Sequence, residues 1–324
     1  MLRSRIVGTG SAVPKKVVTN HDLEGLVDTT DAWITSRTGI SERRIAVNEP
    51  CSELASRAGK AALKAADVSP KDLDLIVVGT VTPEMTFPST ACLVQAHLGV
   101  RPGATAFDVS AACSGFVYAL DVADKFVKAG AHKKALVIGV DQFSRIVDWK
   151  DRSTCVLFGD GAGAIVLSAE KGARGVLSCH THSDGRHWEM LYANGPHQSS
   201  HFDHGHHKSP YLRMHGNETF KIAVRTMGSA ITEAMEANGL KGEDIDLLIP
   251  HQANLRIINA IKDRLKLPDE KLYVNLDRYG NTSAGSIPLA LDEAVREGRL
   301  KENDTVLFVA FGGGFTWASA VARW

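Results

Sequence analysis

AALKAADVSPKDLDLIVVG at residues 61–79 is matched position for position by EAMEANGLKGEDIDLLIPH at residues 233–251, and this repeat decides the fold. The two stretches start 172 residues apart (233 − 61). A second match has nearly the same spacing, because ALVIGV at residue 135 corresponds to VLFVAF at residue 306, 171 residues later (306 − 135). Self-similarity at one spacing predicts two copies of a single structural unit, each about half of the chain.

Apolar runs of strand length alternate with helical periods along the chain. Buried strands are predicted at 74–79, 105–109, 135–140 and 162–168, and amphipathic helices at 52–66 and 114–129. Alternation of this kind favours an α/β fold with a largely buried sheet. We therefore expect an N-terminal half over residues 1–170 and a C-terminal half over residues 171–324, with a polar, histidine-rich loop at about 195–212.

The composition is that of a globular protein. The 324 residues include 37 Lys and Arg against 37 Asp and Glu, and 44% are hydrophobic, which excludes a disordered or collagen-like chain. The neutral charge argues against a general nucleic-acid-binding protein, because such proteins carry a basic excess. No apolar run reaches the roughly 18 residues of a membrane span. The first residues, MLRSRIVGTGSAVP, lack the apolar core of a signal peptide.

Five cysteines, at positions 51, 92, 113, 155 and 179, are scattered without a CxxC pair. This usage is typical of a reducing compartment, so we expect a cytoplasmic protein. Because the charge is balanced and no apolar run is long enough for a membrane span, we expect neither a nucleic-acid nor a membrane partner. The question for function is which of the five, if any, is reactive.

Cys113 stands in AFDVSAACSGF (106–116), where a predicted strand gives way to a helix. The positive end of the helix dipole and the free backbone N–H groups at such a junction favour a thiolate. The same N–H groups can form half of an oxyanion hole. On position alone, a small buried core cysteine explains the residue equally well.

His251 and Asn281 occupy matching places in the second copy. His251 follows the strand DLLI, and Asn281 lies in YGNTSAG before a helix, which is the counterpart of the Cys113 region. SGFVYALDVADKFVKAG after Cys113 corresponds to AGSIPLALDEAVREGRL after Asn281. Copies related by a pseudo-two-fold axis bring their carboxyl edges together, where α/β sheets bind ligands. Each residue singly is explained by packing or a turn, but jointly they predict one cavity that holds Cys, His and Asn.

DVSAACSG, HQAN and GNTSAG together resemble the β-ketoacyl-acyl carrier protein synthase III family of bacterial type II fatty acid synthesis. Further motifs that resemble this family are DAWITSRTGISERR (31–44), TPEMTFPSTAC (82–92), LFGDGAGA (157–164), GNETFK (216–221) and FGGGFTW (311–317). The resemblance covers nearly the whole chain apart from residues 195–212. It implies the thiolase-like fold, a duplicated five-layered α/β/α/β/α arrangement, which agrees with the repeat.

The resemblance implies a decarboxylative Claisen condensation that starts fatty acid synthesis. Cys113 would attack the thioester of a short acyl-CoA, such as acetyl-CoA, and hold the acyl group. His251 and Asn281 would bind the thioester carbonyl of malonyl-acyl carrier protein and stabilise the enolate left by loss of CO2. Backbone N–H groups of Cys113 and Gly313 would form the oxyanion hole for acylation. No cofactor is implied, since the coenzyme A thioester is a substrate.

The resemblance also implies a coenzyme A site at Trp33, Arg37 and Arg152. These residues match positions that hold the adenine between an indole and a guanidinium, and stacking by Trp and Arg supplies that affinity physically. A tryptophan packed on the core with two solvated arginines is the structural alternative.

Protein partners are implied at other positions. Phe87 matches a residue that reaches into the acyl pocket of the neighbouring subunit, which implies a homodimer. Arg256, with Lys221 as a neighbour, would meet the acidic carrier protein, and a short basic patch steers such encounters even at zero net charge. For Lys262, a solvated helix face is the better explanation.

Other motifs argue against competing functions. Gly8-Thr9-Gly10 does not continue as a dinucleotide fingerprint, and FGDGAGA lacks the Lys-Ser/Thr of a P-loop. FGGGFTW lacks the second cysteine of a degradative thiolase. Glu84 is the only loose candidate for the glutamate of a hydroxymethylglutaryl-CoA synthase.

The histidine run departs from the family, and its members are His197, His201, His204, His206 and His207. Imidazoles at this spacing bind zinc, nickel or copper, usually adventitiously, and no cysteine or carboxylate set accompanies them, so we expect no metal site. Because this segment can border the acyl-pocket entrance, the preferred length and branching of the acyl chain stay open. Two alternatives also remain: the same triad in an enzyme that primes a secondary metabolite, and a non-catalytic scaffold that binds carrier protein or metal.

Overall fold

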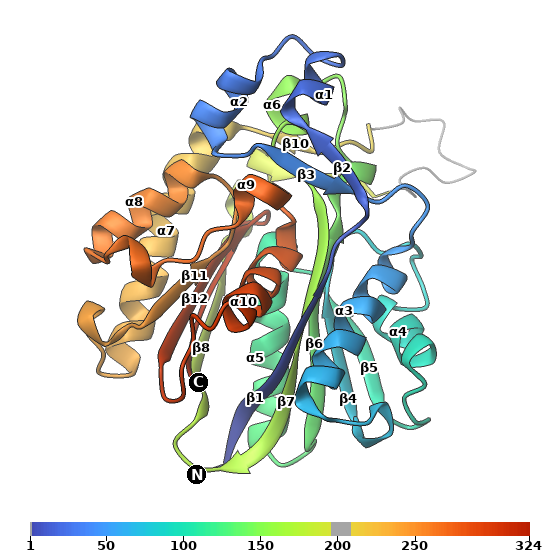
Figure 1. Ribbon diagram of the computed structural model, residues 1–324, viewed down its shortest axis with the longest axis vertical. Coiled ribbons are helices and arrows are strands. Elements are labelled where there is room, and N and C mark those ends of the chain that lie inside the picture. The colour runs from blue at the N-terminus through green and yellow to red at the C-terminus, as the bar shows by residue number, and fades with distance from the viewer. Residues whose placement is uncertain (1, 196–208) are drawn as a thin grey trace.

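The computed structural model describes residues 2–195 and 209–324. The histidine run at 197–207, and with it most of the loop predicted at 195–212, lies outside the described residues. Two principal sheets, with helices between and outside them, make up most of the described chain (Figure 1).

The first sheet belongs to the N-terminal copy and has the strand order β1-β7-β6-β4-β5. Its strands are β1 (Leu2–Ala12), β4 (Leu75–Gly79), β5 (Thr105–Val109), β6 (Lys134–Gln142) and β7 (Asp160–Lys171). β4 pairs in parallel with β5 and β6, whereas β7 is antiparallel to β6 and β1. The predicted apolar runs form this sheet, and β4 is buried along its whole length.

The second sheet repeats this topology with the order β11-β12-β13-β8. Its strands are β8 (Gly175–Ser183), β11 (Leu247–Pro250), β12 (Thr305–Gly312) and β13 (Thr316–Arg323). β11 and β12 are parallel, and β13 is antiparallel to β12 and β8. A parallel bridge from Leu248 to Leu272 lies beside β11, where β5 lies beside β4 in the first sheet. The repeat seen in the sequence is therefore a repeat of strand order and direction.

Helices form three layers, one between the two sheets and one on the outer face of each sheet. α3 (Cys51–Ala66) and α4 (Thr90–Leu98) cover the outer face of the first sheet, and α7 (Gly216–Ala237) and α8 (Leu255–Leu265) cover that of the second. Between the sheets lie α5 (Gly115–Lys128) and α10 (Ser286–Arg296), each in contact with both sheets (Figure 1). The five-layered α/β/α/β/α arrangement that we predicted is therefore confirmed.

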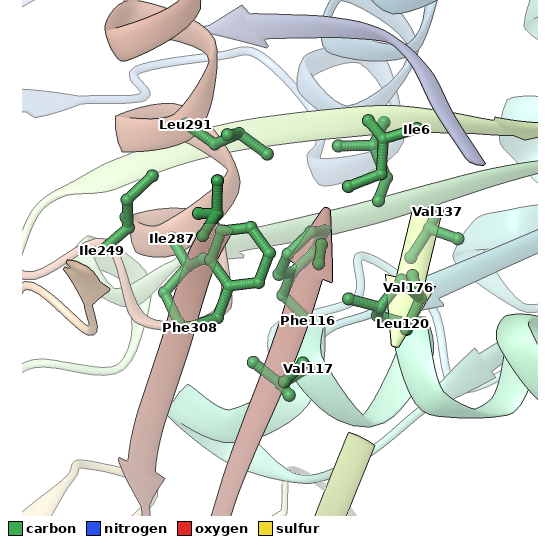
Figure 2. Close-up of a cluster of buried hydrophobic side chains, with 14 of the residues drawn as sticks. Ile6, Phe116, Val117, Leu120, Val137, Val176, Ile249, Ile287, Leu291 and Phe308 are labelled. Atoms are coloured by element: carbon green, nitrogen blue, oxygen red, sulfur yellow. The ribbon is translucent and has the colours of Figure 1, made fainter. Parts of the chain in front are cut away.

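The central layer forms the largest part of the core. Phe116 of α5 and Ile287 of α10 pack between Val137 of β6 and Phe308 of β12, and all four side chains are buried (Figure 2). Because this cluster draws on both copies, burial of apolar area holds the two halves together.

The turns before the two inner helices have the same unusual backbone conformation. Ala112 in the 3-10 helix η2 (Ala112–Ser114) has φ +46°, and Ser283 in η7 (Ser283–Gly285) has φ +52°. The two residues are 171 positions apart (283 − 112), like the matched strands β6 and β12. Residues other than glycine rarely adopt positive φ, so the same conformation at both places identifies one duplicated turn.

Shorter elements complete the described chain, several of them at the end of the molecule drawn uppermost in Figure 1. They are α1 (Asn20–Glu24), α2 (Asp31–Thr38), α6 (Arg152–Cys155), α9 (Leu276–Tyr279), β2 (Lys16–Thr19), β3 (Glu42–Ile45), β9 (Leu191–Tyr192) and β10 (Arg213–Met214). The other 3-10 helices are η1 (Pro70–Asp72), η3 (Phe143–Arg145), η4 (Gly185–Met190), η5 (Gly242–Asp244) and η6 (Asp269–Lys271). In the described part of the chain, none of the helices is both long and apolar enough to cross a bilayer.

Candidate active site

A cavity of about 1020 Å³ opens where parallel strands of both sheets end. Thr80 after β4 and Ser110 after β5 line it from the first copy, and His251 after β11 lines it from the second. The predicted triad of Cys113, His251 and Asn281 lines this one cavity. The structure thus brings together three residues that are far apart in the sequence, at the sheet edge where ligands are expected.

Cys113 lies in η2, between the end of β5 and the start of α5 at Gly115. Burial raises the pKa of its thiol to about 12, and a hydrogen bond from the Ser283 hydroxyl, 3.4 Å from Sγ, opposes this rise. The charge of Asp141 raises the same pKa further. Burial thus opposes the thiolate that the start of the helix was expected to favour.

His251 emerges from the end of β11, and its backbone N–H donates to Val309 of β12 at 2.8 Å. The side chain is 2% exposed, and burial lowers the pKa of the imidazole to about 3. Nδ1 is buried and has no hydrogen-bond partner among the described residues. At neutral pH the ring is uncharged, so it keeps one N–H that can donate to an oxygen bearing negative charge.

Asn281 is held by backbone pairing with the LFGDGAGA segment. Its N–H donates to Leu157 at 2.8 Å, and its carbonyl accepts from the N–H of Gly159 at 3.0 Å. A Cβ on Gly159 would lie 2.3 Å from the Tyr279 carbonyl oxygen, so only glycine permits this approach. Oδ1 of Asn281 accepts from the Ser283 N–H at 2.8 Å, which leaves the Nδ2 donors for a ligand.

The glycine run after β12 lies against Cys113. A Cβ on Gly312 would lie 2.6 Å from the Cys113 nitrogen, and one on Gly313, which lines the cavity, would lie 2.9 Å from the Leu191 carbonyl oxygen. The absence of side chains here lets main chain from both copies meet at one point, as a backbone oxyanion hole requires.

Trp33, Arg37 and Arg152 form one cluster, of which Trp33 and Arg37 line the cavity. The guanidinium carbons of Arg37 and Arg152 each lie 4.9 Å from the centroid of the Trp33 ring. Arg152 also donates to the Asp28 carbonyl oxygen at 2.6 Å. The cluster offers aromatic and cationic faces to a flat ligand.

The residues predicted for protein partners lie on the surface. Phe87 is 83% exposed and does not line the cavity of its own chain. Arg256 at the start of α8 lines the cavity, and its guanidinium lies 5.4 Å from the Phe220 ring. Lys221 is exposed on α7 beside Phe220. Lys262 forms an ion pair with Asp269 and its side chain is only 19% exposed, so it is neither the solvated residue that we expected nor available for carrier-protein docking.

Glu84 has a structural role in this fold. Its Oε2 accepts from the N–H of Ser52 at 2.8 Å, and its other oxygen bonds the Ser52 hydroxyl. The carboxylate thereby caps α3, whose N-cap Pro50 supplies no side-chain hydrogen bond. Glu84 does not line the cavity, so it is not placed to act with Cys113.

No group of three or more His, Cys, Asp or Glu side chains within residues 2–195 and 209–324 is placed to hold a metal ion.

Two residues near Cys113, Asp141 and Ser283, were not predicted from the sequence. Asp141 directly follows the apolar run ALVIGV, and a carboxylate at the end of a buried strand is a recognisable signal. Ser283 lies inside the GNTSAG motif but nothing in its type or spacing pointed to Cys113.

Comparison with known proteins places the chain in a family. Two family models match it, described as 3-oxoacyl-[acyl-carrier-protein (ACP)] synthase III over residues 107–185 and as the C terminal part of the same synthase over residues 235–324. A β-ketoacyl-[acyl-carrier-protein] synthase III of Alkalilimnicola ehrlichii is 55% identical and covers 100% of both chains. One of Aquifex aeolicus is 51% identical, with 99% of both chains covered.

Solved structures agree with this result. The 3-oxoacyl-[acyl-carrier-protein] synthase III from Aquifex aeolicus superposes with a TM-score of 0.93 at 50% identity, covering 99% of this chain and 100% of that one. The priming β-ketosynthase from the R1128 polyketide pathway superposes with a TM-score of 0.92 at 35% identity, covering 99% and 96%. This chain therefore belongs to the β-ketoacyl-acyl carrier protein synthase III family.

Proposed function

We propose that the chain catalyses the decarboxylative Claisen condensation of a short acyl-CoA with malonyl-acyl carrier protein, and so initiates type II fatty acid synthesis. The observation that carries this proposal is the single cavity that Cys113, His251 and Asn281 line from two copies of one unit. The identity of 51–55% over the full chain to β-ketoacyl-acyl carrier protein synthases III supports the same reaction.

The first half-reaction is acylation of Cys113. The thiol loses its proton, the sulfur attacks the thioester carbon of acyl-CoA, and the carbon–sulfur bond to coenzyme A breaks. The departing coenzyme A sulfur takes up a proton, so the products are acyl-Cys113 and coenzyme A. Backbone N–H groups of Cys113 and Gly313 are the donors that the close approach of the glycine run favours for the tetrahedral oxyanion.

The second half-reaction is condensation at the acyl-cysteine. His251 and Asn281 donate to the thioester carbonyl of malonyl-acyl carrier protein, and this stabilises the enolate that forms as CO2 leaves. A neutral imidazole and an amide are suited to this, because burial keeps the pKa of His251 at about 3. The enolate carbon attacks the acyl carbon, Cys113 leaves as a thiolate, and a proton restores the thiol.

Substrate binding is proposed at the cavity's two flanks. Trp33, Arg37 and Arg152 hold the adenine of coenzyme A, which their cation–π cluster supports. Arg256 and Lys221 form the docking site for the acidic carrier protein, because both are exposed near the cavity. This local patch coexists with a net charge of zero.

We further propose a homodimer in which Phe87 enters the partner subunit's acyl pocket. An apolar ring that is 83% exposed is costly unless a partner covers it, and Met85 beside it is 49% exposed. Sedimentation of the wild type and of Phe87→Asp tests this association.

Five free cysteines are in keeping with a cytoplasmic enzyme, and the proposed chemistry uses no cofactor besides the coenzyme A thioester substrate.

Covalent acylation read by intact mass tests the proposal directly. Purified protein is mixed with acyl-CoAs of differing length and branching, then with malonyl-acyl carrier protein. We expect short acyl groups to appear on the wild type, and neither adduct nor β-ketoacyl product with Cys113→Ala. Product formed by Cys113→Ala would refute the mechanism.

His251→Ala separates the two half-reactions. Acylation relies on Cys113 and backbone donors, so the variant should still form acyl-Cys113, while decarboxylative condensation is lost. Equal loss of both steps would contradict this division of labour.

Priming of polyketide synthesis is the competing function. The structurally similar priming β-ketosynthase is 35% identical to this chain, whereas several fatty-acid-type relatives reach 51–55%. We therefore favour fatty acid synthesis, and the acyl-CoA panel also tests this choice.

A further inference from the structure

Ser283 lies behind the nucleophile, away from the substrate cavity. Its side chain is fully buried and does not line the cavity, yet its hydroxyl lies 3.4 Å from Sγ of Cys113. Nothing in the reaction proposed above assigns it a role. A buried hydroxyl at this distance from the reacting sulfur can act on it without touching substrate.

Asp141 anchors the Ser283 turn. The carboxylate is fully buried, and its Oδ2 accepts from the N–H of Ala284, the residue after Ser283, at 3.2 Å. Its Oδ1 accepts from the hydroxyls of Thr80 and Thr82 at 3.0 and 2.8 Å and from Val81 N–H at 2.8 Å. This network fixes the carboxylate, and through it the turn that carries Ser283.

Comparison of the two copies shows that this arrangement is specific to the Cys113 side. Ser283 is the counterpart of Ala112 (283 − 112 = 171), and Asp141 is the counterpart of Gly312 (312 − 141 = 171). The backbone turn is the same in both copies, since φ is +46° at Ala112 and +52° at Ser283. The turn itself therefore requires neither the hydroxyl nor the carboxylate, and the hydroxyl donates to Cys113.

We propose that Ser283 is a positioning residue for Cys113: its hydroxyl, on a turn that Asp141 holds, donates to the sulfur and stabilises the thiolate when it forms. The hydroxyl already donates its proton to Sγ in the resting site, over 3.4 Å. When the thiol ionises, this hydrogen bond gains a charged acceptor and becomes stronger. The role deepens the acylation step of the proposed function, on which it rests.

The charges around Cys113 set the direction of the effect. Asp141 of β6 raises the pKa of the thiol, as burial does, and the neutral His251 after β11 contributes no positive charge. The Ser283 hydroxyl lowers the pKa, so its removal leaves the thiolate less stable. A hydrogen bond to a charged group corresponds to about a 10- to 100-fold change, or about one to two pKa units.

Alkylation of Cys113 by iodoacetamide tests the proposal without any acyl substrate. Thiolate sulfur displaces iodide, so well below the pKa the rate rises tenfold per pH unit. From about pH 6 to about pH 9, we expect the logarithm of the alkylation rate of Ser283→Ala to rise with pH in parallel with that of the wild type. At each pH the rate of the variant should be about 10- to 100-fold lower. Ala112 shows that the turn accepts alanine at positive φ. Ser286→Ala is the matched control, because that buried hydroxyl bonds only Thr282 among the described residues.

Peptide mapping distinguishes this role from a structural one. Loosening of the fold would expose buried Cys51 and Cys155 and speed their alkylation, whereas the proposal predicts slower alkylation at Cys113 alone. An unchanged Cys113 rate in Ser283→Ala, or an equal slowing in Ser286→Ala, overturns it. Should Ser283→Ala fold poorly, Ser283→Gly removes the hydroxyl with full backbone freedom and is judged in the same way. Absence of condensation by the wild type would refute the proposed function and leave this result standing.

Discussion

Gly312→Ala should disable acylation while leaving the nucleophile intact. A Cβ at this position would lie 2.6 Å from the Cys113 nitrogen and 3.1 Å from the Ser114 nitrogen, both backbone atoms. Neither can move freely, because Ser114 begins the turn into α5 and Cys113 is buried. The added methyl group therefore occupies the side of the Cys113 N–H, or pushes that N–H out of alignment.

The size of the effect follows from the loss of one oxyanion donor. Removal of such a donor slows acyl transfer about 100- to 1000-fold, and this is the decrease we expect in the rate of Cys113 acylation. Overpacking of the interior should also lower the free energy of unfolding by about 1–3 kcal/mol, so folding is checked by thermal melting. Gly185→Ala is the control, since a Cβ there would meet no atom within 4 Å.

Two reactions of the same sulfur separate the possible causes. Acylation by acyl-CoA develops an oxyanion, whereas alkylation by iodoacetamide does not. Gly312→Ala should therefore lose the first and keep the second near the wild-type rate, both followed by intact mass. Acylation within about tenfold of the wild type would refute the placement of the oxyanion hole.

Three further predictions concern binding, stability and pH. Trp33→Ala should raise the KM for acyl-CoA by about tenfold or more, since stacking on a base is worth about 1–3 kcal/mol, and leave acyl-pantetheine turnover unchanged in a steady-state assay. Glu84→Ala should lower the free energy of unfolding by about 0.5–2 kcal/mol through loss of the α3 cap, without slowing acylation. Because burial holds the pKa of His251 at about 3, below its unfolded value of 6.5, the unfolded state binds a proton first as pH falls. Stability is therefore lost below about pH 6.5, and urea unfolding should show the wild type losing about 2 kcal/mol more than His251→Gln between about pH 7 and pH 5.

Much of the fold was predictable because its signals are local. The helix predicted at 114–129 is α5 at Gly115–Lys128, and the strand predicted at 105–109 is β5 over the same residues. Hydrophobic periodicity and the repeat spacing determine such elements, since both depend only on neighbouring residues and on chain order. The convergence of Cys113, His251 and Asn281 also followed, from the rule that ligands bind at the carboxyl edges of such sheets.

The electrostatics of the site could not be predicted in this way. The raised pKa of Cys113 depends on how completely the docked copies bury it, and the Ser283 contact joins residues 170 positions apart. The role of Glu84 was equally unpredictable, since its carboxylate caps a helix that begins 33 residues earlier at Cys51 (84 − 51). Contacts of this kind depend on the packed tertiary structure, which periodicity does not encode.

The duplicated fold has one proposed reaction centre because the two copies differ at equivalent points. The equivalent turns place Ala284 opposite Cys113 (284 − 113 = 171), one residue away from the sequence match that set Ala284 opposite Ser114. The second copy therefore has no thiol at this position. The backbone N–H of Ala284 donates a hydrogen bond to the Asp141 carboxylate, at 3.2 Å. The turn of Cys113 in the first copy instead meets Gly312 of the second copy, the equivalent of Asp141, which has no side chain. Among the described residues the N–H of Cys113 has no backbone partner, so it can donate to a substrate oxygen. The backbone N–H of the second turn thus donates to a carboxyl oxygen of the chain itself, and this supports a donor role for the equivalent N–H of the first turn.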